Sequence, residues 1–168
     1  MNPEMNEIYE RNINTSVRKK DEHTFVTKSS ILDLNHNMLV LLTVDIDSKT
    51  ITDASAQMVK CPFKICRATL VNMKKLIGMK IERGINKKIS KAIGRSHGCT
   101  HLFELCIDAI RLTSNVMLGL NFNEEEWRDE WKERYTPDEV FIERTRPFLK
   151  DTCYPFSDRK NLDSKEEV

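Results

Sequence analysis

The stretch NMLVLLTVDIDSKTITDASAQMV, residues 37–59, decides the fold class. In its first half, Val40, Leu42 and Val44 alternate with residues that face the other way, which is the period-two pattern of a β-strand. The turn-forming residues DSKT follow at 47–50, and the chain then returns as a second strand. The stretch therefore predicts an antiparallel hairpin.

The segment before the hairpin, HTFVTKSSILDL at 23–34, holds one or two short strands. The sheet is therefore either a hairpin or a three-stranded meander. Residues 1–22 are polar and lack a clear period, so we expect them to form a flexible N-terminal arm.

Helical periodicity replaces the strand pattern after residue 60. Pro62 suits the first turn of a helix that ends at Gly78, and the segment at 84–94 is a second, shorter helix between glycines. The most apolar helix is expected at 100–120, in the centre of the core. The first of these helices is predicted to bury a stripe of Ile65, Leu70, Met73, Leu76 and Ile77.

The fold class that follows is α+β, with a small antiparallel sheet that carries helices on one face. We expect the core domain at 23–120, a helical C-terminal extension at 121–156 and a disordered tail at 157–168. Cap residues predict two helices in the extension, at 123–135 and 136–149, and Pro147 ends or bends the second.

The composition excludes several functional classes. A net charge of +1 argues against a nucleic-acid partner, and the basic stretch at 74–91 alternates with apolar residues as on solvated helix faces. The chain lacks the pattern of a signal peptide or a membrane span, so we expect a cytoplasmic protein without a membrane partner. In that compartment five cysteines are thiols, metal ligands or core residues rather than disulfides.

The motif SHGCTHLFEL at 96–105 carries the most chemistry. Cys99 stands at the start of the long helix, where the helix dipole and free backbone N–H groups favour its thiolate form. His101 lies within the first helical turn, and Glu104 with Asp108 is spaced to hydrogen-bond it from behind. Thiolate and neutral imidazole are ligands that zinc and iron accept.

Two ligands this close in sequence do not complete a tetrahedral site, so other residues must contribute. His36 precedes the first strand of the hairpin, and Cys61 and Cys66 flank the strand-to-helix junction in KCPFKIC. Our first hypothesis is therefore a metal- or iron–sulfur-binding accessory protein that holds zinc or an Fe–S cluster, with Cys66, Cys99, His101, His36 and Cys61 as its ligand set.

Two other functions remain open. In a thiol-dependent enzyme for sulfur or acyl transfer, Cys99 is the nucleophile and His101 or His97 is its base. In a binding module for a small molecule or a protein, the motif only shapes a turn. Cys106 falls on an apolar helix face and is expected to be a buried core residue, Cys153 an incidental thiol and His23 a solvated histidine. Trp127, Trp131 and Phe141 give the extension an aromatic face that packs on the core or on a second subunit of a homo-oligomer.

The order LTVD, ITDA, Pro62, IC and HGCTHLFEL resembles the bacterial family named domain of unknown function 2889. The likeness runs over about residues 36–118 and is strongest at Gly98-Cys99-Thr100-His101-Leu102. His36 resembles the histidine that the family places ahead of the first core strand. The resemblance implies the core domain but no established activity.

The layout of a hairpin, a cysteine before a helix, and His-x-Cys opening a long helix is also similar to NifU-like iron–sulfur scaffold proteins, a SufE/NifU-like arrangement. By that likeness, Cys61 or Cys66 corresponds to the first ligand and the pair His97 and Cys99 to the last. The middle cysteine of that family has no counterpart in GMKIERG, which leaves a mononuclear site as the implication.

Overall fold

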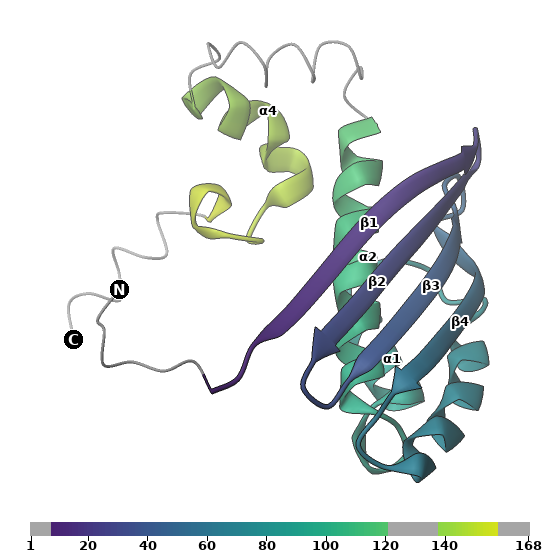
Figure 1. The fold of residues 1–168 in the computed structure, drawn as a ribbon. Coiled ribbons are helices and arrows are strands. Elements are labelled where there is room, and N and C mark those ends of the chain that lie inside the picture. The colour runs from purple at the N-terminus through teal and green to yellow at the C-terminus, as the bar shows by residue number, and fades with distance from the viewer. Residues whose placement is uncertain (1–7, 121–137, 158–168) are drawn as a thin grey trace. The chain divides into compact units, whose positions relative to one another are not determined.

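The computed structural model describes residues 8–120 and 138–157. Contacts divide the chain into two units, Met1–Met117 and Leu118–Val168. The first unit holds an antiparallel sheet and the helices that pack on it, so the expected α+β class is confirmed (Figure 1).

The sheet has four strands in sequence order, each antiparallel to the next. They are β1 (Arg11–Asp21), β2 (Thr24–Asp33), β3 (Asn37–Asp45) and β4 (Thr50–Lys60). This meander contains the hairpin predicted from the sequence, and residues 23–34 supply one strand rather than two.

Strand β1 corrects the assignment of residues 1–22 to a flexible arm. Residues 11–21 pair with β2 along their whole length, apart from an irregularity between Lys19 and Asp21. The strand lies at the edge of the sheet, and its side chains are exposed or half-buried. Backbone hydrogen bonds to β2 therefore hold a polar segment that has no apolar alternation to reveal it.

One face of the sheet is buried. Val40, Leu42 and Val44 have no exposed surface, as their alternation predicted. Strand β4 departs from strict alternation because register shifts interrupt its pairing with β3, so that Ile51 and Ala54, three residues apart, are both buried.

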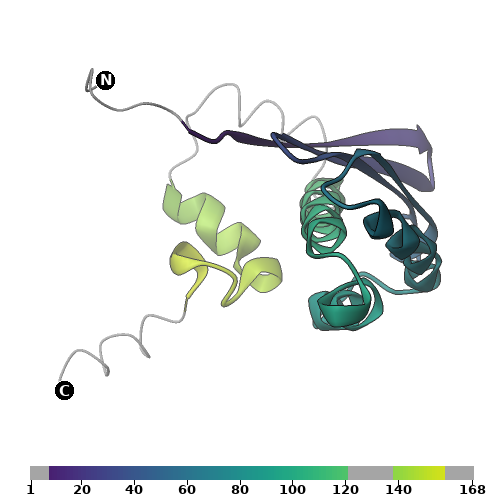
Figure 2. The ribbon, with the colours of Figure 1, turned by 60° about the horizontal axis from the view of Figure 1, so that its bottom comes forward.

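The helices pack against this buried face (Figure 2). They are η1 (Lys64–Leu76), α1 (Ile85–Ile93), the short η2 (Arg95–His97) and α2 (Thr100–Leu120). The Thr27 and Thr113 hydroxyls lie 2.6 Å apart in the core and connect β2 to α2. The helices expected at 84–94 and 100–120 are thus confirmed.

Segment η1 lies where a helix was predicted, but it is a 3₁₀-helix with three residues per turn. That period aligns Leu70, Met73 and Leu76, of which the last two are fully buried. Ile65 and Ile77 fall off this face and are 77% and 45% exposed, so their place in the apolar stripe was wrong.

The second unit contains α4 (Asp138–Leu149) and the short η3 (Tyr154–Phe156). Helix α4 confirms the helix expected at 136–149, and Pro147 lies inside it. The helix expected at 123–135, with Trp127 and Trp131, lies outside the described residues, as does the tail after Ser157. Among the described residues, no helix is both long enough and apolar enough to cross a bilayer.

Candidate functional site

The turn between β2 and β3 is closed by the carboxylate of Asp33. Its Oδ1 accepts hydrogen bonds from the backbone N–H groups of Asn35 and His36, at 2.8 and 2.7 Å. The Asp33 N–H in turn donates to the His36 carbonyl oxygen at 2.9 Å. Aspartate is common at such a position because its side chain can satisfy the turn's own N–H groups.

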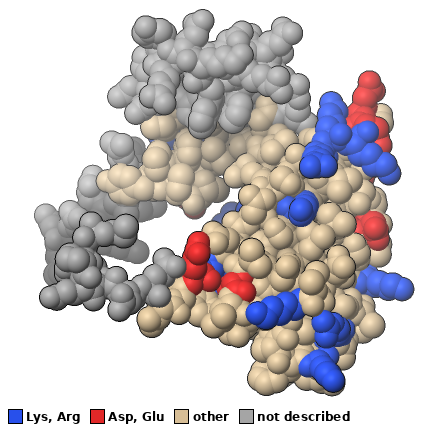
Figure 3. All heavy atoms as spheres, viewed as in Figure 1, with Lys and Arg blue, Asp and Glu red and all other residues tan. Residues whose placement is uncertain are grey.

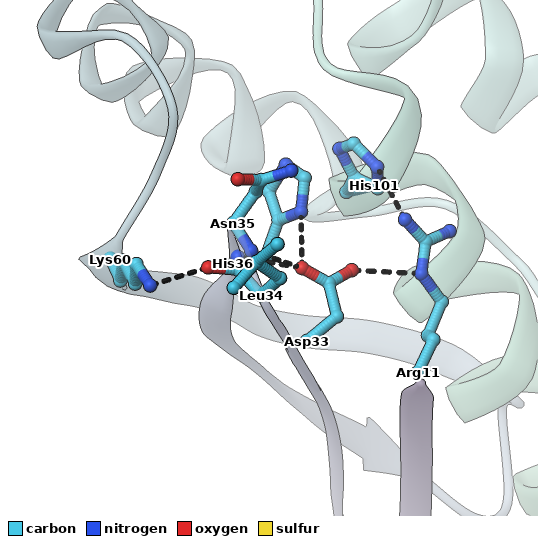
Figure 4. Close-up of polar contacts among 7 residues, drawn as sticks. All are labelled: Arg11, Asp33, Leu34, Asn35, His36, Lys60 and His101. Atoms are coloured by element: carbon cyan, nitrogen blue, oxygen red, sulfur yellow. Dashed lines mark hydrogen bonds and ion pairs between the residues drawn. The ribbon is translucent and has the colours of Figure 1, made fainter. Parts of the chain in front are cut away.

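The same carboxylate organises a polar network at this end of the sheet (Figure 4). Asp33 Oδ1 lies 2.9 Å from His36 Nδ1, and Oδ2 accepts a bond from Arg11 Nε at 2.8 Å. The Asp33 side chain has no exposed surface, whereas that of Arg11 is 36% exposed. Arg11 reaches Asp33 because the two residues are direct partners in the pairing of β1 with β2.

Asp33 is ionised despite its burial. Burial by itself raises the pKa of a carboxyl group, but the bonds from Asn35, His36 and Arg11 outweigh it and hold the pKa of Asp33 far below its usual range. A buried aspartate that accepts this many hydrogen bonds fixes the orientation of each donor. Because Nδ1 of the His36 ring is bonded to Asp33, Nε2 is the ring nitrogen that remains for another partner.

The ring of His36 contacts that of His101. Their centroids are 3.9 Å apart and their planes differ by 42°. His101 Nε2 also lies 3.5 Å from Arg11 Nη2. Burial, followed by the charges of His36 and Arg11, lowers the pKa of His101 against the opposing effect of Glu104 and Asp33. These effects favour the neutral form of His101.

A tight loop places His101 at the first turn of α2. The Cys99 N–H donates to the Ile93 carbonyl oxygen at 2.9 Å, and the Cys99 carbonyl accepts from the Phe103 N–H. A Cβ at Gly98 would stand 1.9 Å from the Ile93 carbonyl oxygen, so only glycine fits there. The Gly-Cys-Thr-His motif thus serves to join α1 to α2 closely enough for His101 to meet His36.

The structure brings together two of the five predicted metal ligands, His36 and His101. The other three, Cys61, Cys66 and Cys99, are half-buried free thiols. The Cys61 thiol donates to the Phe63 carbonyl oxygen at 3.4 Å. In residues 8–120 and 138–157, His, Cys, Asp and Glu side chains do not form a group of three or more that could hold a metal ion. Asp33 holds His36 in contact with His101, and the three cysteines of the predicted set do not join these histidines in a metal-binding group among the described residues.

The remaining cysteines and His97 lie outside the polar network around Asp33. Among the described residues, Cys99 has no hydrogen bond with a histidine, and His97 Nε2 bonds the Lys91 carbonyl oxygen at 2.9 Å. Cys106 is buried as predicted, and burial raises the pKa of its thiol to about 12, which makes it inert. Cys153 is exposed.

Sequence reasoning missed Arg11 and Asp33, the residues that build the network. The spacing Asp-x-x-His at 33–36, after a strand, is a signal that could have identified the turn. Arg11 carries no such signal, since its role comes from strand pairing with a residue 22 positions away.

Figure 3 shows the charged side chains of the viewed face in several separate places, and the expectation of no nucleic-acid partner stays a prediction.

Residues 10–113 match the model of a protein family that is described as "Protein of unknown function (DUF2889)". The match begins at β1 and ends in α2, so it includes Arg11, Asp33, His36 and His101. No curated protein and no solved structure gives a significant match to the chain. The SufE/NifU-like arrangement accordingly stays a prediction.

Proposed function

The chain belongs to the DUF2889 family, whose description names no activity, and from its own geometry we propose that it is a binding module for a small organic acid. The single observation that carries this proposal is the buried Asp33 carboxylate, which holds Arg11 with one oxygen and His36 with the other. This network fixes the Arg11 guanidinium and the His36 imidazole beside a second imidazole, that of His101.

The network leaves a defined set of donors and acceptors for a ligand. Arg11 has five N–H donors, and Asp33 takes only the one on Nε. In the neutral form of His36, with Nδ1–H directed to Asp33, the Nε2 atom is an acceptor. If His101 Nε2 accepts from Arg11, its Nδ1 carries a proton and is a donor. Two donors, one of them cationic, beside one acceptor suit a carboxylate that carries a neighbouring hydroxyl group.

The part of the site that solvent reaches is the Arg11 side chain, which is 36% exposed. The hollow of 350 Å³ near this end of the sheet is not this site, since Arg11, His36 and His101 do not line it. The N-terminus of α2, which carries His101, adds partial positive charge to the site. The helix N-terminus and the Arg11 guanidinium both favour an anionic ligand near the exposed part of the Arg11 side chain.

Binding is tested by ¹⁵N NMR titration with glycolate and with acetate, which lacks the hydroxyl group. We expect glycolate to shift the resonances of residues around Asp33 and His101 and to bind more tightly than acetate. Arg11→Gln should weaken glycolate binding about tenfold, as expected for a bond to a charged group. Arg18→Gln, an exposed arginine of the same strand, is the matched control and should leave it unchanged. Equal effects of the two substitutions, or equal binding of the two acids, would refute the proposal.

Metal binding is the second candidate, and one observation favours it. Histidines that bind metals usually donate their other ring N–H to a carboxylate, as His36 is placed to do with Asp33. A site of this kind would use His36 and His101 and take its remaining ligands from solvent or from Cys99. Elemental analysis of the protein from its host separates the two candidates. About one equivalent of zinc or iron, lost in His101→Gln, would favour the metal site.

A further inference from the structure

A second pocket, of 310 Å³, is lined by β1, by α2 and by Asn86 of α1. The apolar side chains of Ile13, Phe103 and Ile107 line part of it, and Glu104, Asp108 and Arg111 contribute charge. All of these residues belong to the first unit of the chain. The pocket is therefore a mixed one, with apolar walls and a few charged groups, as is common for small-molecule sites.

One polar atom of a residue that lines this pocket has no hydrogen-bond partner among the described residues. Glu104 Oε2 is buried and accepts no hydrogen bond from the described residues. Leaving a buried carboxylate oxygen unpaired is costly, and native structures rarely do so. Helical spacing puts Asp108 one turn after Glu104 on the same face of α2, so that a second carboxylate lies beside the first.

The charge of the pocket is unbalanced. Glu104 and Asp108 carry two negative charges and Arg111 carries one positive charge, which leaves one negative charge. Within the part of the chain that the structure describes, ion pairs do not join Arg111 to either carboxylate. A single cation in the pocket would supply both the missing charge and the missing hydrogen-bond donor.

We propose that this pocket binds a primary amine with a short apolar body. Its ammonium group donates to Glu104 Oε2, and its hydrocarbon part lies on Ile13, Phe103 and Ile107. An ammonium ion has three donors and no acceptor, which matches an orphaned carboxylate oxygen. The amine pocket is distinct from the organic-acid site, because none of the three residues that bind the acid lines it.

The test uses n-butylammonium as a probe, with n-butanol and butyrate as neutral and anionic probes of similar size. In ¹⁵N NMR titrations of the full chain, we expect n-butylammonium to shift resonances of Ile13 and of residues 103–111, and the other two probes to bind at least several-fold more weakly. Glu104→Gln keeps the shape of the side chain and should weaken binding about tenfold. Glu22→Gln, in the distant β1–β2 turn, removes the same charge and should have no effect.

Asp108→Asn provides a second variant if Glu104→Gln fails to fold. It should weaken binding of n-butylammonium by a smaller factor, since no orphaned oxygen belongs to Asp108. Binding of n-butylammonium that is absent at millimolar concentration, that n-butanol equals, or that survives both substitutions would overturn the proposal.

Discussion

Each end of the sheet carries one aspartate–histidine pair, and the two pairs have nearly the same length. His23 Nδ1 lies 2.7 Å from Asp47 Oδ2, and His36 Nδ1 lies 2.9 Å from Asp33 Oδ1. In the first pair both side chains are about two-thirds exposed, at 66% and 69%; in the second they are 8% and 0% exposed. The two pairs therefore differ in burial and not in the distance between their atoms.

Burial matters because it raises the cost of every unmade bond. Water can replace either partner of the pair His23 and Asp47, so that pair adds little to stability. The Asp33 side chain is shielded from water, so water cannot replace a lost partner. Its two oxygens accept hydrogen bonds from Arg11, His36 and two backbone N–H groups. The same chemical pair is thus a surface detail at one end and an organising centre at the other.

The largest test of this contrast is the removal of each carboxylate. Asp33→Ala leaves Arg11, His36 and two backbone N–H groups without their acceptor, and we expect it to lower the free energy of unfolding by about 3–5 kcal/mol. Asp47→Ala should change it by less than about 1 kcal/mol. Urea unfolding followed by far-UV circular dichroism measures both. Similar losses in the two variants would show that the buried network does not hold this end of the sheet.

A smaller effect should appear in acid. The folded pKa of Asp33 lies below the unfolded value of about 4, so Asp33 contributes stability above that pH and loses it as the pH falls toward the folded pKa. Between about pH 4 and pH 2, Asp33→Asn should therefore lose less stability than the unchanged protein.

Asp45, at the other end, is the control for this acid profile. Its pKa is lowered by bonds from Ser48, but it is half-buried rather than buried, so Asp45→Asn should flatten the profile less than Asp33→Asn. Urea midpoints measured over this range decide the matter. The same flattening in both variants would mean that burial adds nothing to the acid response.

The smallest effect concerns the titration of His101. Burial and then the nearby charge of His36 lower the pKa of His101, so His36→Gln should raise it. His23→Gln, at the exposed pair, should leave the pKa of His101 where it is. NMR titration of the imidazole resonances measures both variants. An unmoved pKa in His36→Gln would indicate that the contact between the two rings is not maintained in solution.

The core was predictable because its signals are local. Alternation along 37–44 predicted the buried face of β3, and the glycines around α1 predicted where that helix begins and ends. Two local expectations failed for physical reasons. Strand β1 is a polar edge strand that backbone bonds hold, and η1 winds at three residues per turn, which displaced Ile65 and Ile77 from the predicted apolar stripe.

Half of the candidate site was predictable as well. His36 and His101 were both candidates, and the structure places their rings in contact. The three cysteines assigned to the same set do not join them in a metal-binding group within the described residues. A thiol is recognised in a sequence by its type alone, whereas a ligand set depends on where several side chains point, and no local pattern encodes that.

By itself the sequence determined the α+β class, the family and the tight helix start at Gly98-Cys99-Thr100-His101, because turn geometry and apolar periodicity act between near neighbours. Only the tertiary structure decided that Arg11, from an edge strand without apolar signal, meets Asp33 and a histidine 90 positions away. Strand pairing and helix packing select such polar partners, and burial then makes their bonds matter.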